Sequence, residues 1–118
     1  MVKETILVAD DNDRMRDFIV RGLLQTNGFD TLTASNGREA LKIAYHHKPD
    51  LMLLDFNMPE LNGMQVLQHI AKRRVKIASI FMTAHGDEAI AIDAFRLGVR
   101  DYLIKPFAAD DLLEAIER

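Results

Sequence analysis

Five side chains of this sequence combine the groups needed for metal-assisted phosphoryl chemistry, and each follows a short apolar run. Asp10 and Asp11 follow the first run, Asp55 another, Thr83 the next and Lys105 the last. A short apolar run bounded by turn residues is typical of a strand buried on both faces. Ligands of open α/β sheets bind outside the carboxyl ends of such strands. We therefore expect these five side chains to converge on one site.

The chemistry of this set is that of oxygen ligands and phosphate. Three carboxylates placed close together repel one another, and loss of water adds to the cost. A cation among them makes physical sense, and oxygen ligands suit a hard ion such as Mg²⁺. A carboxylate beside such an ion can act as a nucleophile toward phosphorus. Lys105 can neutralise the charge of phosphoryl oxygens as a point charge. Thr83 can donate a hydrogen bond to another phosphoryl oxygen.

Each of these residues also has a purely structural explanation when it is considered alone. Asp55 can be a turn residue, and Asp10 and Asp11 can cap a helix whose dipole favours carboxylates. Thr83 can bond to nearby backbone, and Lys105 can be a surface cation. Their joint placement at corresponding ends of different predicted strands favours a shared site.

The elements that must position these residues alternate regularly along the chain. Apolar runs predict strands at 6–9, 29–34, 51–54, 77–82 and 100–104. Helical spacing of apolar residues follows each run, and the apolar stripes of the first and fourth helices include Phe18 and Phe95. Strands that alternate with helices indicate the α/β class, here a doubly wound (βα)5 parallel sheet with right-handed crossovers. The Thr-rich run at 29–34 is expected at an edge.

Local signals mark several helix ends. Gly28 predicts the end of the first helix, because glycine is the usual residue just past a helix. Asn36 and Glu39 have the spacing of a capping box, with Asn in place of Ser or Thr. Asp87 is expected to cap the fourth helix.

Composition restricts the class of protein. A chain of 118 residues with 48% hydrophobic content suits one globular domain over residues 1–118. The net charge of −3 predicts no direct binding to nucleic acid, and the basic segment 72–76 is interpreted as a solvated helix end, or else a contact patch. The chain has no cysteine for disulfides or thiolate metal sites. The sequence contains no pattern typical of a signal peptide or a membrane span, and we expect a cytoplasmic domain. The sequence ends inside a helical pattern, which is what we expect of a domain cut from a longer protein.

The sequence resembles the receiver domains of two-component response regulators over essentially its whole length. No single motif is decisive, but their order and intervals together are highly specific. The departures at Ala9 and Val99 do not touch the chemistry. The motifs are Leu7-Val8-Ala9-Asp10-Asp11-Asn12, Leu53-Leu54-Asp55-Phe56-Asn57-Met58-Pro59 with Gly63, Met82-Thr83-Ala84, Gly98-Val99-Arg100-Asp101-Tyr102 and Lys105-Pro106-Phe107.

The resemblance implies a flavodoxin-like fold with sheet order 2-1-3-4-5 and a phosphorelay function without catalytic turnover. Asp55 would accept a phosphoryl group from a phosphohistidine of a sensor histidine kinase or a histidine phosphotransfer protein. Mg²⁺ would be the cofactor, bound by Asp11, Asp55 and the main-chain carbonyl of Asn57, while Asp10 would act mainly through a metal-bound water. His85 and Asn57 stand at positions that influence the lifetime of the acyl phosphate in this family.

The resemblance also implies a switch. Lys105 would contact the phosphoryl group, and its bond to Pro106 would be cis, although only about 5–6% of X–Pro bonds in folded proteins are cis. Phosphorylation adds about −1.5 to −2 charges at Asp55. Thr83 would move toward the new group, and Tyr102 would rotate inward. The face built by the fourth helix, last strand and last helix would then bind a downstream protein or output domain.

Two other functions remain open. One is a pseudo-receiver, a binding module that never accepts phosphate, although the complete set of carboxylates, Thr and Lys argues against it. The other is a phosphatase of the haloacid dehalogenase type, whose Asp-x-Asp start resembles residues 11–13. Residues 14–15 break that motif, and Asn57 cannot serve as its acid/base. A calcium loop is excluded, because residues 11–13 lack the glycine and distal glutamate of an EF-hand.

Overall fold

The computed structural model describes residues 3–84 and 88–118 and shows five parallel strands with helices on both faces. The order is β2-β1-β3-β4-β5, which confirms the flavodoxin-like α/β prediction and the edge position of the Thr-rich strand. The strands are β1 (Thr5–Ala9), β2 (Asp30–Ala34), β3 (Leu51–Asp55), β4 (Ala78–Thr83) and β5 (Asp101–Ile104).

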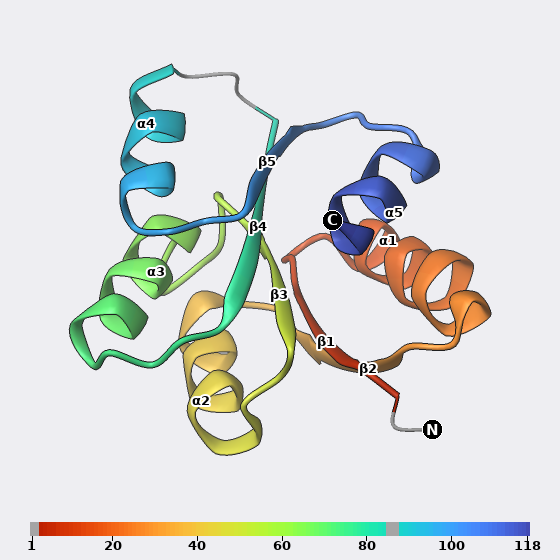
Figure 1. Ribbon diagram of the computed structural model, residues 1–118, viewed down its shortest axis with the longest axis horizontal. Coiled ribbons are helices and arrows are strands. Elements are labelled where there is room, and N and C mark those ends of the chain that lie inside the picture. The colour runs from red at the N-terminus through yellow and green to blue at the C-terminus, as the bar shows by residue number, and fades with distance from the viewer. Residues whose placement is uncertain (1–2, 85–87) are drawn as a thin grey trace.

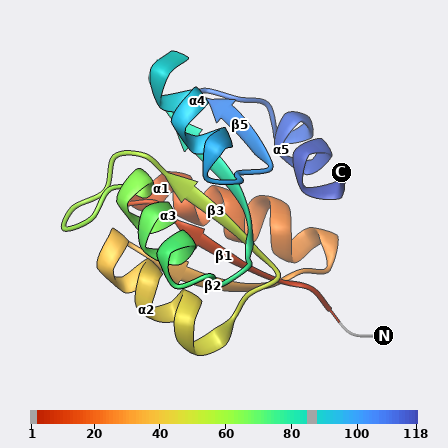
Figure 2. The same ribbon diagram turned by 60° about the vertical axis from the view of Figure 1, so that its left-hand side comes forward.

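Helical segments cover the sheet on both sides. Figures 1 and 2 show the first helical segment and α5 on one face and α2, α3 and α4 on the other. The helical segments are α1 (Asp13–Asp17), the π-helical η1 (Phe18–Leu24), the short 3₁₀ turn η2 (Gln25–Asn27), α2 (Gly37–His47), α3 (Gly63–Lys72), α4 (Glu88–Arg96) and α5 (Ala109–Glu117). None of the helices within the described ranges is long and apolar enough to span a bilayer.

The side chains of β1 point alternately into two apolar clusters. Ile6 and Val8 pack with residues of η1 and α5, whereas Leu7 and Ala9 pack with residues of α2, α3 and α4. Every residue of β3 is buried, including Asp55 at its end. Both faces of β1 and β3 therefore lie in the core.

The first helix differs from the expected α-helix. After α1 the chain continues as a π-helix, in which the Gln25 N–H donates to the Val20 carbonyl five residues earlier. Residues 19–20 and 23–24 are the buried residues of this segment, and they pack against the sheet. Phe18 is left 46% exposed, so its expected place on the inner stripe is wrong. Gly28 ends the run in a left-handed conformation, as predicted.

The fourth helix also buries less than its sequence suggests. Ala94 is the one residue recorded as buried within Glu88–Arg96. Phe95 is 50% exposed, which corrects its expected inward position. Ala94 packs in the cluster under the helix, while the Phe95 ring lies 6.5 Å from that of Tyr102, between centroids. Asp87, the expected cap of this helix, lies outside the described residues.

Capping of the middle helices is partly as expected. The side-chain oxygen Oδ1 of Asn36 accepts a hydrogen bond from the Glu39 N–H at 2.7 Å. The Glu39 carboxylate accepts from the Ser35 N–H rather than that of Asn36, so the box is incomplete. A complete box stands at α3, where Asn62 and Gln65 bond reciprocally.

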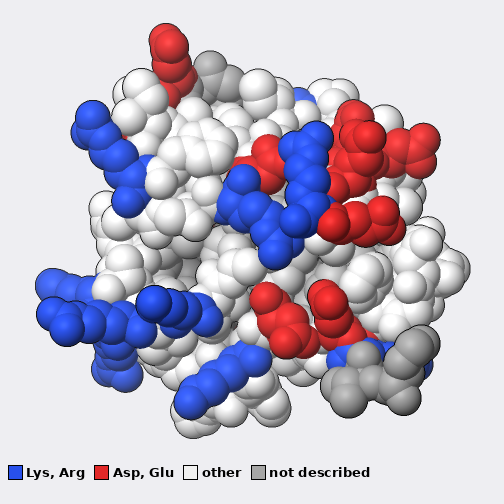
Figure 3. All heavy atoms as spheres, viewed as in Figure 1, with Lys and Arg blue, Asp and Glu red and all other residues white. Residues whose placement is uncertain are grey.

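The basic segment 72–76 begins at the last residue of α3. Its four cations are exposed, as expected of a solvated helix end. Figure 3 shows positive side chains gathered where α3 ends in Figure 1. The Arg73 guanidinium lies 4.6 Å above the centre of the Tyr45 ring, which ties this end of α3 to α2.

Candidate functional site

The candidate site lies at the carboxyl edge of the parallel sheet. Asp10 directly follows β1, Asp55 ends β3, Thr83 ends β4 and Lys105 directly follows β5. Because these strands run parallel, their ends share one edge, and the structure brings the side chains of Asp10, Asp11, Asp55 and Lys105 together there. Carboxylate oxygens of Asp10, Asp11 and Asp55 lie within 4.8 Å of one another.

Asp10 is held on every side. Its side chain is fully buried, with Oδ1 accepting from the Asn12 N–H at 2.9 Å and Oδ2 accepting from the Lys105 ammonium at 2.7 Å. Its main-chain carbonyl accepts from the Arg16 guanidinium at 2.7 Å. Its N–H donates to the Ala34 carbonyl of the neighbouring strand. These contacts fix both the backbone and the carboxylate of the first acidic residue.

Asp55 occupies an unfavourable position for a charge. It is 5% exposed, and the pKa of its carboxyl is raised from 3.8 to about 6. Burial is the largest cause and the negative charge of Asp10 adds to it, whereas the Lys105 ammonium, 3.4 Å from Asp55 Oδ1, acts in the opposite direction. A second cation beside these carboxylates would therefore favour the ionised form of Asp55.

Lys105 connects the carboxylates to the last two strands. The main-chain N–H of Lys105 donates to the main-chain carbonyl of Thr83 at 2.7 Å. The Lys105 side chain is 15% exposed. The ammonium lies closer to Asp10 than to Asp55, at 2.7 Å against 3.4 Å. The peptide bond to Pro106 is cis, as the resemblance implied.

The expected switch residues lie on neighbouring strands, with Tyr102 opposite Phe81 and Thr83 opposite Ile104. Thr83 is fully buried at the end of β4. Tyr102 is half-buried on β5, and its ring stacks on Phe81 with centroids 6.0 Å apart and an interplanar angle of 19°. Phe95 of α4 lies on its other side at 6.5 Å between centroids. Tyr102 thus already packs between β4 and α4.

Two expected residues have a weaker relation to the cluster. The side chain of Asn57 is exposed in the loop after β3, and the contribution expected of it is a main-chain carbonyl. His85 lies outside the described residues. Among the side chains of residues 3–84 and 88–118, the group that could hold a cation is therefore Asp10, Asp11 and Asp55. This set offers only carboxylate oxygens, with Asp11 exposed to solvent, and it fits a hard divalent cation.

Two further residues support the site: Gly63, which belongs to a motif quoted from the sequence, and Arg16, which was not singled out there. Gly63 begins α3 against the end of β3, where a Cβ atom would lie 2.5 Å from the Asp55 carbonyl oxygen. Arg16 reaches back from α1 to the Asp10 carbonyl. The Asn62-Gly63 pair was interpreted as a turn, and no role was assigned to Arg16 from the sequence, so neither contact was predicted.

Comparisons with known proteins agree with this geometry. The family model of the response regulator receiver domain matches residues 6–117. The chain is 37% identical to the chemotaxis protein CheY of Bacillus subtilis, covering 96% of this chain and 94% of that protein. It is 39% identical to the positive alginate biosynthesis regulatory protein of Pseudomonas aeruginosa, covering 96% of this chain but 46% of that protein. The crystal structure of the CheX-CheY-BeF3-Mg+2 complex from Borrelia burgdorferi includes a chain that is 25% identical, with a TM-score of 0.88 and coverage of 96% of this chain and 86% of that one.

Proposed function

The chain belongs to the response regulator receiver domain family, and on that premise we propose that Asp55 accepts a phosphoryl group in a reaction that requires Mg²⁺. The observation that carries the proposal is the gathering of three carboxylates within 4.8 Å, with the Lys105 ammonium beside two of them. Receiver domains bind Mg²⁺ at an acidic pocket of this kind. Relatives in this family are signalling proteins rather than turnover enzymes.

Each residue of the site would have a separate task. Asp11, Asp55 and the main-chain carbonyl of Asn57 would hold Mg²⁺, and Asp10 would orient a metal-bound water. The ion would neutralise charge on the carboxylates and on the phosphoryl oxygens. Lys105 would turn from Asp10 toward the phosphoryl group, which requires little movement because its ammonium already lies 3.4 Å from Asp55.

The transfer itself would be a displacement at phosphorus. An ionised oxygen of Asp55 would attack, an O–P bond would form, and the P–N bond to the imidazole of a phosphohistidine would break. The donor would be a sensor histidine kinase or a histidine phosphotransfer protein. The raised pKa of Asp55, about 6, still leaves the carboxyl mostly ionised at neutral pH. The Thr83 hydroxyl would donate to one phosphoryl oxygen and Lys105 would pair with another.

The signal would leave through the face formed by α4, β5 and α5. Exposed apolar side chains on this face are Ile92, Phe95 and Ile104, at 46%, 50% and 51% exposure. Movement of Thr83 toward the phosphoryl group would change the packing around Tyr102 and so reshape this face. A downstream protein or an output domain would bind there. Residues 1–118 would act as a single receiver domain, alone or within a longer chain.

Intact-mass spectrometry with Mg²⁺ and acetyl phosphate tests the proposal directly. We expect one phosphoryl adduct on the wild-type protein and none on Asp55→Asn or in excess chelator. Asp30→Asn, which removes an exposed carboxylate of the edge strand, is a matched control that should still form the adduct. A folded wild-type protein that forms no adduct would favour the pseudo-receiver, and rapid turnover of phosphate monoesters would favour the phosphatase.

A further inference from the structure

We propose that Arg16 is a positioning residue, which holds the backbone between Asp10 and Asp11 in the geometry that Mg²⁺ requires. This inference rests on the proposed function, because it concerns the same acidic site. Arg16 would touch neither the ion nor the phosphoryl group. It would act through the Asp10 carbonyl, to which its guanidinium donates at 2.7 Å.

The guanidinium makes two contacts at once. Nη1 donates to the Asp10 carbonyl, and Nη2 pairs with the Asp13 carboxylate on the preceding turn of the helix. The rigid fork of a guanidinium suits such a double contact, which a lysine ammonium cannot reproduce in one plane. The Arg16 side chain is 21% exposed, whereas that of Arg21, farther along the same helical run, is 77% exposed.

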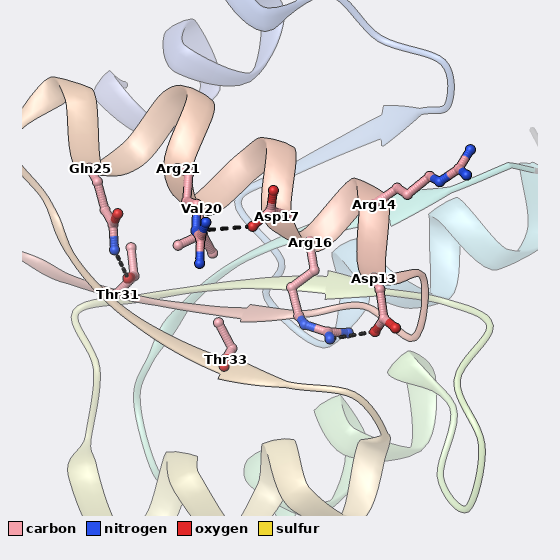
Figure 4. A pocket seen from close by; sticks show the side chains of 9 residues that line it. All are labelled: Asp13, Arg14, Arg16, Asp17, Val20, Arg21, Gln25, Thr31 and Thr33. Carbon is pink, nitrogen blue, oxygen red and sulfur yellow. Dashed lines mark hydrogen bonds and ion pairs between the residues drawn. The ribbon is translucent and has the colours of Figure 1, made fainter.

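Figure 4 shows the difference between these two arginines. Arg16 lies in the groove beside the first helical segment with its guanidinium against Asp13, while Arg21 pairs with Asp17 instead. Both are cations in the same groove and both pair with an aspartate of the helix. Of these two arginines, Arg16 is the one with a recorded hydrogen bond to Asp10 among the described residues.

The Asp10 carbonyl is a sensitive point of the site. The peptide group that contains this carbonyl is planar and includes the Asp11 nitrogen, so a hydrogen bond to its oxygen restricts how the group that joins Asp10 to Asp11 can turn. The Asp10 side chain is held separately by Asn12 and Lys105. Asp11 is exposed, and a turn of this peptide group would also move its side chain. Partners that orient metal ligands in this way typically contribute 10–100-fold to metal affinity.

The charge of Arg16 acts in the opposite direction to its hydrogen bond. A cation near the carboxylates repels Mg²⁺, so removal of the charge alone would tighten Mg²⁺ binding. Loss of the bond to the Asp10 carbonyl would loosen the ligand geometry and weaken binding. The sign of the change therefore separates a positioning role from a purely electrostatic one.

Isothermal titration of the unphosphorylated protein with Mg²⁺ tests the proposal. We expect Arg16→Met to raise the Mg²⁺ dissociation constant roughly 10-fold. The matched control Arg21→Met removes the same charge from the same groove. It should change the Mg²⁺ dissociation constant by less than about twofold, because exposed ion pairs contribute little energy. Arg16→Lys keeps the repelling charge but loses the fork, so it should raise the dissociation constant at least as much as Arg16→Met, and it provides the test if Arg16→Met does not fold. Unchanged or tighter binding by a folded Arg16 variant would overturn the positioning role.

The rate of adduct formation at Asp55 gives a second readout. Arg16→Met should need more Mg²⁺ for its half-maximal rate, while the maximal rate at saturating Mg²⁺ returns close to that of the wild type. A merely destabilised protein would not show this separation. If the wild type binds Mg²⁺ but forms no adduct, the proposed function fails while the titrations still decide the role of Arg16. A wild type that binds no Mg²⁺ would overturn both.

Discussion

Ionisation of Asp55 in its buried position is expected to lower the free energy of unfolding of the metal-free protein at neutral pH. Its pKa rises from 3.8 to about 6 on folding, chiefly through burial. Between these values the folded state binds more protons than the unfolded state, so stability falls as pH rises through this window. The rise is about two units, and each unit is equivalent to about 1.4 kcal/mol, which gives a penalty of about 3 kcal/mol above pH about 6.

Asp55→Asn removes this penalty and keeps the shape of the side chain. The free energy of unfolding of the variant should therefore exceed that of the wild type by about 1–3 kcal/mol at pH about 7.5 in excess chelator. The lower figure allows for a weaker hydrogen bond from Lys105 to the amide. The difference should shrink toward zero at pH about 4, where the wild-type carboxyl is protonated in the folded state. Urea unfolding followed by far-ultraviolet circular dichroism measures both values.

A matched control separates this effect from the loss of any aspartate. Asp30→Asn changes an exposed carboxylate of β2 and should shift the free energy of unfolding by less than about 0.5 kcal/mol across the same pH range. The reasoning would be refuted if Asp55→Asn were less stable than the wild type at neutral pH, or if its advantage were the same at acidic and neutral pH.

Three further changes test other parts of the site. Mg²⁺ should raise the melting temperature of the wild type by mass action, and Asp11→Ala should abolish most of that rise; full retention in a calorimetric scan would contradict the metal assignment. Thr83→Ala should keep phosphorylation of Asp55 but weaken phosphate-dependent partner binding, and unchanged binding in a pull-down would rule out the switch. Gly63→Ala should cost about 1–3 kcal/mol in urea unfolding, because its Cβ would lie 2.5 Å from the Asp55 carbonyl oxygen and 2.9 Å from Phe81 Cε1; a neutral result would show that α3 can shift freely.

Much of the sheet was predictable because its strands follow simple rules. A fully buried parallel strand needs an unbroken apolar run, and 51–54 provides one next to Asp55. The Thr-rich composition of 29–34 indicated an edge, and β2 lies there. Parallel strands bring their carboxyl ends to one edge, so the convergence of the acidic residues with Lys105 also followed from the order of the elements.

Helix faces were less predictable, because several apolar residues at helical spacing can be grouped into more than one stripe. In η1 the buried residues are 19–20 and 23–24, and Phe18 is left in solvent. In α4 the buried residue is Ala94, and the neighbouring Phe95 is half exposed. Both errors arise from geometry that a sequence pattern does not contain.

The sequence by itself determined which groups form the candidate site, because a strand-end position is a local property of an apolar run and the polar residue after it. Only the tertiary structure decided how those groups are arranged. It placed the Lys105 ammonium nearer to Asp10 than to Asp55. It brought Arg16 onto the Asp10 carbonyl and Gly63 against Asp55. These relations depend on distances between segments far apart in the chain or on the direction of a side chain, and residue types and spacing specify neither.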